Sequence, residues 1–306
     1  MTKKYFLISL PYYGSQTILN GVLFMAIHAE ASSTIIQQLR SGLQPEQLRR
    51  ALQDIFAGWQ HRELWGTLGL HDVRQRYRRS TLGPFWITLS MGIMVFALGI
   101  LYGQIFGQEL DEYMPFLAAG FVVWGLISAI ILGGCQSFIA AEGLIRQLNA
   151  PLSIYAYREV WTALIAFGHN IWVFVFAALW YGIFPRWDTL WLIPAILLVM
   201  INGFWMVLFL GLLSARFRDV PLIVASIIQV LFFLTPVIWQ PTMLPERALF
   251  LELNPFYHLV EILRGPMLGI PPSLNNWIPV IIMAVVGVMV TLLFYSTYRW
   301  RIAYWV

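Results

Sequence analysis

The sequence predicts an all-α integral membrane protein with six transmembrane helices, an N-terminal amphipathic interfacial helix and short outer re-entrant helices between the fifth and sixth spans. Two observations carry this prediction. Only 11% of the 306 residues are charged, against about 25% in an ordinary soluble domain, and the mean hydropathy is +0.71. Several apolar runs also reach the roughly 20 residues that a helix needs to cross a bilayer core. A soluble fold of this length cannot bury so much apolar surface, so lipid must be the solvent.

The apolar runs define the spans, and short charged joints separate them. We place the six spans at residues 84–106, 114–140, 160–184, 190–215, 220–239 and 277–298. The runs do not alternate apolar and polar residues, as the roughly 10-residue strands of a membrane β-barrel would. Helices are therefore the expected spanning elements. The six-span domain covers residues 84–300, and residues 301–306 form a cytoplasmic tail.

The basic residues predict the orientation of the spans, because cytoplasmic loops carry an excess of Lys and Arg. If the segment before the first span is cytoplasmic, all but three of the 19 Lys and Arg residues fall on the cytoplasmic side. The exceptions are Arg186, Arg247 and Arg264, and the first outer loop is acidic. Both termini are therefore expected in the cytoplasm.

Residues 1–45 form a poorly defined N-terminal extension. Lys3 and Lys4 precede an apolar stretch, and residues 29–31, Ala-Glu-Ala, are similar to a signal-peptidase site. Proline, glycine and amide residues interrupt the stretch, which makes it a poor signal sequence and a poor span. Cleavage would also send the following basic segment outward, against the charge distribution. A loosely ordered extension is the favoured interpretation, with Met25 as an alternative start.

Residues 46–83 form a cytoplasmic amphipathic helix and a basic segment. Apolar residues recur there at helical spacing among polar ones: Leu48, Leu52, Ile55, Phe56, Trp59, Leu64 and Leu68. This pattern is typical of a helix that lies in the membrane interface. A soluble helix packed on a partner protein is the alternative.

The outer connection between the fifth and sixth spans, residues 240–276, is rich in proline and contains two short apolar segments. These segments, residues 247–253 and 256–268, are too short to cross the bilayer. Irregular backbone persists at membrane depth only where protein or a water-filled cavity surrounds it. Re-entrant or interfacial helices and an ordinary structured outer loop fit this pattern equally well.

The residue types that catalysis or ion coupling would require are scarce. A P-loop needs a lysine after its glycines, and neither of the two lysines, Lys3 and Lys4, follows such a loop. The chain therefore has no ATPase site of its own. Within the spans, we interpret His169 as a packed, hydrogen-bonded residue and Asn202 and Gln229 as interhelical hydrogen-bonding residues. Proton or sodium coupling is not expected.

A membrane glycosyl- or acyltransferase is an alternative function. Its only plausible site is the outer set Glu252, His258 and Glu261, in which the last two are one helical turn apart. No metal-ligand spacing accompanies them, so we expect no catalytic residue and no metal or cofactor bound by this chain. A pathway that takes its energy from another subunit is the favoured interpretation.

Four stretches of the sequence together point to one family. The most specific is HDVRQRYRRSTLGPFW, residues 71–86, ahead of the first span. The others are EGLIR at 142–146, LSARFRDVP at 213–221 and LNPFYHL at 253–259. In order and spacing they resemble the permease subunits of polysaccharide-exporting ABC transporters, over about residues 60–300. The similarity is greatest to the O-antigen (lipopolysaccharide) export branch.

The resemblance implies a permease homodimer in a bacterial inner membrane, bound to two copies of a separate ATP-binding subunit that holds ATP and Mg. It also implies that the loop between the second and third spans docks in that subunit as a coupling helix. The implied contact residues are Glu142, Gly143, Leu144, Ile145 and Arg146. The amphipathic segment would be a second docking element. The outer segments would be gate helices, with gate residues Asn254, Pro255, Phe256, Tyr257, His258 and Glu261.

The cargo implied by the resemblance is a polysaccharide on undecaprenyl pyrophosphate. Its pyrophosphate needs cations at the inner leaflet, and the basic segment offers Arg74, Arg76, Arg78 and Arg79. Anchoring of these arginines to anionic lipid headgroups is the alternative. A smaller lipid-like or drug cargo and a non-catalytic assembly scaffold are alternative functions, and no nucleic-acid partner is expected.

Overall fold

The computed structural model describes residues 44–76, 78, 83, 85–243 and 249–306, and every regular element in these ranges is helical. The predicted N-terminal extension lies outside the described residues, apart from its last two. The long apolar helices are α4 (Phe85–Phe106), α5 (Leu110–Gln136), α7 (Ser153–Trp180), α8 (Leu192–Arg216), α9 (Val220–Leu234) and α12 (Leu274–Tyr298). The remaining helices are α2 (Pro45–Gln60), α3 (Arg62–Arg76), α6 (Glu142–Gln147), η1 (Trp187–Trp191), η2 (Pro241–Met243), α10 (Leu249–Glu252), α11 (Pro255–Met267), η3 (Arg299–Arg301) and α13 (Ile302–Trp305).

Five of the described helical segments are long and apolar enough to cross a membrane. They are α4, α5, α7, the continuous segment Trp187–Arg216 and the continuous segment Leu274–Trp305. Each overlaps one of the predicted spans. The fifth predicted span forms α9, which has only 15 residues. At 1.5 Å per residue α9 is about 22 Å long, less than the roughly 30 Å of a hydrocarbon core.

The helix of the fifth predicted span is shorter than expected because a proline interrupts it. The residue before a proline is pushed out of the α region, so α9 stops ahead of Pro236, and the prediction of a helix to residue 239 was wrong. Residues 235–238 are buried and non-helical, so their backbone needs partners from elsewhere. Tyr113 Oη donates to the Ile238 carbonyl at 2.7 Å, and Arg264 Nη1 donates to the Pro236 carbonyl at 2.6 Å.

Helix α5 is the centre of the bundle and contacts α4, α7, α8, α9 and α11. Close approach depends on small residues, since lipid removes the hydrophobic force that drives helices together in water. A Cβ at Gly134 would lie 3.0 Å from the Val207 Cα on α8, and a Cβ at Gly120 would lie 2.9 Å from the Val237 carbonyl oxygen. These two glycines let α8 and the segment after α9 touch the α5 backbone.

The polar residues within the spans are only partly placed as predicted. Asn202 on α8 donates to the Val280 carbonyl on α12 at 3.4 Å, which confirms the interhelical interpretation. His169 is hydrogen-bonded within its own helix, to the Ile165 carbonyl at 2.8 Å. Gln229 lies exposed on α9, and no hydrogen bond joins its side chain to another described residue.

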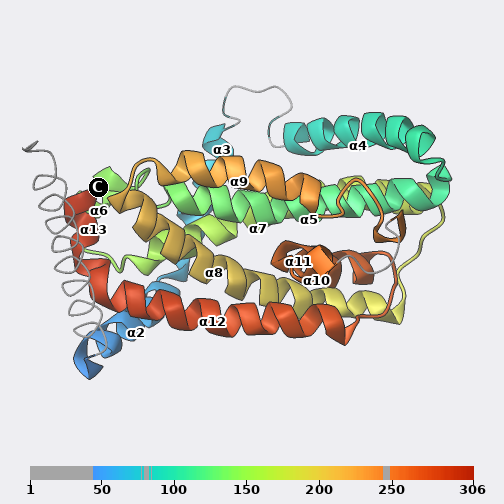
Figure 1. The fold of residues 1–306 in the computed structure, drawn as a ribbon. Coiled ribbons are helices and arrows are strands. Elements are labelled where there is room, and N and C mark those ends of the chain that lie inside the picture. The colour runs from blue at the N-terminus through green and yellow to red at the C-terminus, as the bar shows by residue number, and fades with distance from the viewer. Residues whose placement is uncertain (1–43, 77, 79–82, 84, 244–248) are drawn as a thin grey trace, which may run out of the picture.

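The basic joints lie together at one end of the bundle. Figure 1 shows α2, α6, α13 and the C-terminal residues at that end. Arg218 donates to the Trp305 carbonyl at 3.2 Å, and Arg299 donates to the Arg50 carbonyl at 2.8 Å, so joints distant in sequence meet there. We call this region, made of α2, α3, α6, α13 and the α8–α9 connection, the basic end.

Helix α11 is enclosed by the bundle, where it contacts α5, α8 and α12 (Figure 1). His258, Leu263 and Arg264 are among its buried residues. The outer connection therefore contains a helix surrounded by protein and not an exposed loop. Residues 247 and 248 of the other predicted outer segment lie outside the described residues, and its remainder includes α10.

Arg264 is the largest fully buried side chain among the described residues, and it connects α11 to its surroundings. It pairs with Glu261, and its guanidinium lies 4.0 Å from the centre of the Phe116 ring on α5. Although Arg264 was counted with the outer basic residues, it is part of the protein interior. Its charge therefore does not indicate on which side of the membrane this segment lies.

The burial of Arg264 leads to a stability prediction. Arg264→Met should lower the free energy of unfolding by about 3–5 kcal/mol, because it leaves the Glu261 carboxylate and the Pro236 carbonyl without their partner. Unfolding of the purified protein in detergent micelles measures this. Arg186→Met, at an exposed arginine of the same end, is the matched control. An equal shift in both variants would contradict the prediction.

Candidate functional site

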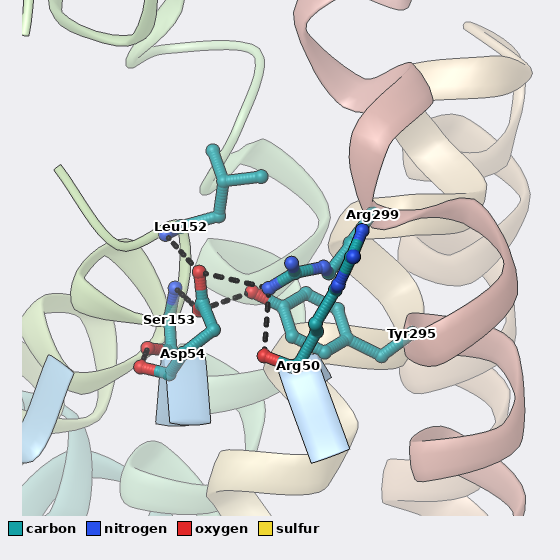
Figure 2. Close-up of polar contacts among 6 residues, drawn as sticks. All are labelled: Arg50, Asp54, Leu152, Ser153, Tyr295 and Arg299. Atoms are coloured by element: carbon teal, nitrogen blue, oxygen red, sulfur yellow. Dashed lines mark hydrogen bonds and ion pairs between the residues drawn. The ribbon is translucent and has the colours of Figure 1, made fainter. Parts of the chain in front are cut away.

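Asp54 attaches α2 to two helices of the bundle (Figure 2). Its carboxylate accepts the backbone N–H groups of Leu152 and Ser153, at 3.2 and 3.0 Å, where α7 begins. From α12, the Tyr295 hydroxyl donates to the same carboxylate at 2.5 Å, and Arg299 forms an ion pair with it at 3.5 Å. A carboxylate at a helix N-terminus also complements the helix dipole. One side chain thus holds α2 against both α7 and α12.

A second ion pair attaches α3 to the same helix α7. Arg158 donates two hydrogen bonds to Asp72, both at 2.5 Å, in the paired geometry that suits a guanidinium and a carboxylate. Both side chains are mostly buried. The amphipathic segment is therefore fixed to the bundle at two points, one in each of its helices.

Aromatic rings fill the corner where α2 meets α3. Trp59 and Trp65 lie on either side of the corner, and both are within 6 Å of the Tyr157 ring on α7, measured between ring centres. Tyr157 in turn stacks on Phe204 of α8 at 4.4 Å. The apolar face that was predicted to lie in the membrane interface is therefore divided. Part of it packs on the bundle, whereas Leu52, Phe56 and Trp59 are largely exposed.

The predicted coupling residues form α6, a short helix with no buried residue. Glu142 and Arg146 pair with each other at 2.9 Å along one side of it. Leu144 and Ile145 turn toward the bundle, where they pack on its core. Gly143 is exposed, and a Cβ added there would meet no atom within 4 Å. Of the five predicted contact residues, Glu142, Gly143 and Arg146 are therefore the ones open to a partner.

Arg146 connects α6 to the rest of the basic end by a hydrogen bond. Its Nη2 atom donates to the Val306 carbonyl at 2.6 Å, immediately after α13. Ile302 and Val306 are buried against the bundle, so this contact has a rigid support. Helix α6 is exposed but not loosely attached.

The arginines predicted to bind a pyrophosphate lie at the end of α3 and just after it. Arg74, Arg76 and Arg78 are exposed, whereas Arg79 lies outside the described residues. Exposed guanidinium groups are available to phosphate oxygens from a cargo or from lipid. The geometry by itself does not separate these two interpretations.

The predicted gate residues lie at the start of α11 and in its first turns. Asn254 caps the helix by accepting the Phe256 N–H at 3.0 Å, and its amide donates to the Thr235 hydroxyl at 3.0 Å. Pro255 occupies the first turn, where its missing N–H costs nothing. The Phe256 ring contacts the Trp124 ring of α5. The LNPF part of the motif is thus a helix start joined to the broken segment after α9.

His258 and Glu261, two residues of the set proposed for an alternative enzyme, are bonded to neighbouring residues of the chain. Both ring nitrogens of His258 are engaged: one lies 2.9 Å from the Asn276 amide oxygen, the other 2.9 Å from the Glu252 backbone carbonyl. The Glu261 carboxylate pairs with Arg264. The described residues also contain no group of three or more His, Cys, Asp or Glu able to hold a metal ion. This arrangement favours a structural role. Tyr257 packs beside the His258 ring.

Sequence reasoning missed the Asp54 network. Asp54 lies one helical turn from Ala51 and Gly58, the two buried residues of α2, so it is on the buried face of that helix. The apolar pattern of the sequence indicates a different face, so it offers no signal of this contact. The Asp54 partner Tyr295 is 241 residues away and was assigned only to a span. No local pattern connects the two.

Comparisons with a family model and with individual proteins agree in pointing to transporter membrane subunits. A model of the family described as ABC-2 type transporter matches residues 63–268, from the start of α3 to just after α11. The O-antigen export system permease protein RfbA of Myxococcus xanthus is 26% identical over 207 residues, which is 66% of this chain and 79% of the relative. A protein of the same name from Klebsiella pneumoniae is 25% identical over 177 residues, 58% of this chain and 68% of the relative.

The Asp54 network predicts local stability of α2. Asp54→Asn should raise the hydrogen-exchange rates of the buried α2 amides by about tenfold to a hundredfold, because charge-assisted hydrogen bonds are lost. Hydrogen exchange read by mass spectrometry measures this, with α4 as an internal reference. Glu46→Gln, which removes an exposed ion pair of the same helix, should change little. Unchanged exchange in Asp54→Asn would refute this role.

Proposed function

The chain belongs to the ABC-2 type transporter family, and from this premise we propose that it is the membrane permease of an ATP-driven exporter of undecaprenyl-pyrophosphate-linked O-antigen or a related polysaccharide. The cargo moves from the cytoplasmic to the periplasmic side. Both relatives named above are O-antigen export permeases, which supports this cargo class. The observation that carries the proposal is α6, an exposed helix held on a rigid support at the basic end.

The proposed assembly is a homodimer in a bacterial inner membrane with two copies of a separate ATP-binding subunit. That subunit binds ATP and Mg and supplies the energy. Its docking surface is the basic end, where α6 inserts as the coupling helix and α2 with α3 forms the second contact. The Asp54 and Asp72 contacts support transmission, because a displaced α2 or α3 must carry α7 with it.

The proposed topology has six crossings with both termini cytoplasmic. The start of α2 and the C-terminal residues lie at the same end of the bundle, which supports an even number of crossings (Figure 1). Five of the described segments are long enough to cross, and α9 together with the buried residues 235–238 is the proposed sixth. The excess of arginine at the basic end supports its cytoplasmic placement.

The proposed roles of the remaining sites follow from the same orientation. Arg74, Arg76, Arg78 and Arg79 receive the pyrophosphate at the inner leaflet. Helices α10 and α11 form the outer gate, in which Asn254 and His258 connect α11 to its neighbours. Opening would then require α11 to shift against the segment after α9.

Reconstitution tests the proposal directly. Vesicles that contain this chain and its ATP-binding subunit should hydrolyse ATP and move lipid-linked polysaccharide, whereas vesicles with either protein alone should move none. The reason is that the chain lacks a P-loop lysine. Polysaccharide that becomes accessible to a lectin on the far side measures transport. ATP hydrolysis by this chain alone would refute the proposal.

A substitution at Gly143 tests the coupling role without disturbing the chain. Because a side chain there meets open space, Gly143→Leu should leave thermal unfolding unchanged but weaken binding of the ATP-binding subunit about tenfold, through a clash in the docked complex. Gly168→Leu on α7, also in open space, is the matched control. Equal binding by both variants would exclude α6 from the contact.

A further inference from the structure

A cavity of about 220 Å³ lies where α3 ends, between α4, α5 and α7. Most of its wall is apolar, including Ile87 from α4 and Leu132 from α5. Two wall residues carry opposite charges: Arg76 from α3 and Glu159 from α7. The cavity is therefore amphiphilic, and its two charges come from different helices.

Glu159 is a carboxylate set into the bundle beside a glycine of α5. A Cβ on Gly133 would collide with a carboxylate oxygen of Glu159, so this glycine leaves the space in which the carboxylate sits. The adjacent Arg158 is already committed to Asp72 by two short hydrogen bonds. Within the part of the chain that the structure describes, no hydrogen bond or ion pair joins Glu159 to another side chain.

An ionisable side chain that is largely shielded from water is expensive unless a partner compensates it. The charged side chains that act on Glu159 are Arg158, Asp72 and Arg76. Since Arg158 and Asp72 neutralise each other, Arg76 across the cavity is the remaining cation among these described residues. Arg76 is itself exposed at the end of α3, so it can accept a ligand anion as well.

The two charges select among the ligands that a membrane offers. A pyrophosphate, which the proposed function assigns to Arg76 and its neighbours, satisfies Arg76 but leaves Glu159 without a partner. A phosphatidylglycerol headgroup likewise satisfies Arg76 and leaves Glu159 without a partner. An ethanolamine headgroup carries one ammonium and one phosphate, and its acyl chains can follow the exposed apolar residues of α4. Only this last ligand matches both ends of the cavity.

We propose that this cavity binds the headgroup of an aminophospholipid, with the ammonium at Glu159 and the phosphate at Arg76. The bound lipid bridges α3 to α7 and α5, close to α4 of the first span. The site depends on membrane insertion and not on the proposed cargo. It is measured on the permease alone, so its failure leaves the exporter proposal intact.

Lipid retention by the purified full chain in detergent tests the site. The probes are phosphatidylethanolamine, phosphatidylcholine and phosphatidylglycerol, offered in equal amounts and counted on the protein by native mass spectrometry. The protein should retain phosphatidylethanolamine about tenfold better than phosphatidylcholine, whose methylated nitrogen cannot donate a hydrogen bond. Equal retention of these two lipids would overturn the proposal.

Matched variants assign the two charges. Glu159→Gln should abolish the preference for phosphatidylethanolamine and leave phosphatidylglycerol retention unchanged, whereas Arg76→Gln should lower retention of both. Glu63→Gln and Arg62→Gln, at exposed positions of α3, are the controls and should behave as the parent protein. A preference that survives in Glu159→Gln, or that is lost in Glu63→Gln, would overturn the proposal.

A third variant covers the case in which Glu159→Gln fails to fold. Gly133→Ala keeps both charges but displaces the carboxylate from its position. It should reduce the phosphatidylethanolamine preference, while size-exclusion behaviour and the unfolding temperature confirm that the protein is folded. A folded Gly133→Ala protein that keeps the full preference would overturn the assignment of the ammonium to Glu159.

Discussion

Every backbone polar group inside a bilayer must find its hydrogen-bond partner within the protein, since no water is available there. Helices satisfy this condition along most of the chain, but the buried segment after α9 does not. Two side chains replace the missing helical hydrogen bonds. Tyr113 donates to the Ile238 carbonyl, and Arg264 donates to the Pro236 carbonyl. The second of these brings α11 and its ion pair with Glu261 into the bundle. The enclosure of α11 thus follows from one interrupted helix.

At the basic end, polar side chains that are bonded to several helices hold α2 and α3 rigidly against the bundle. Asp54 collects donors from α7 and α12, and Arg158 is fully used by Asp72. The amphipathic helices are therefore attached by directional bonds as well as by apolar contact. Helix α6 differs, because its outward residues have no bundle partner except through Arg146. A surface that is exposed yet rigidly supported suits the proposed transfer of force from a docked ATP-binding subunit.

The charged residues of the described part of the chain differ in whether a partner neutralises them. Arg264 and Arg158 are each neutralised by a carboxylate of the same chain. Glu159 has no such partner among the described residues, and it faces a cavity whose other charge is Arg76. Because a charge shielded from water is costly without a partner, we propose that a lipid headgroup supplies one. That reasoning separates this cavity from the exposed arginines around it, which can bind any phosphate.

The sequence by itself determined the class of protein, the position of most spans, the placement of α6 and the resemblance to a transporter family. These properties depend on local quantities: the length of an apolar run, the charge of the residues between two spans and the order of short motifs. Only the tertiary structure decided that Arg264 is internal, that Leu144 and Ile145 turn inward, and that Asp54 meets Tyr295. Each of these outcomes depends on partners brought together by helix packing, and a residue's local pattern does not specify a partner hundreds of residues away.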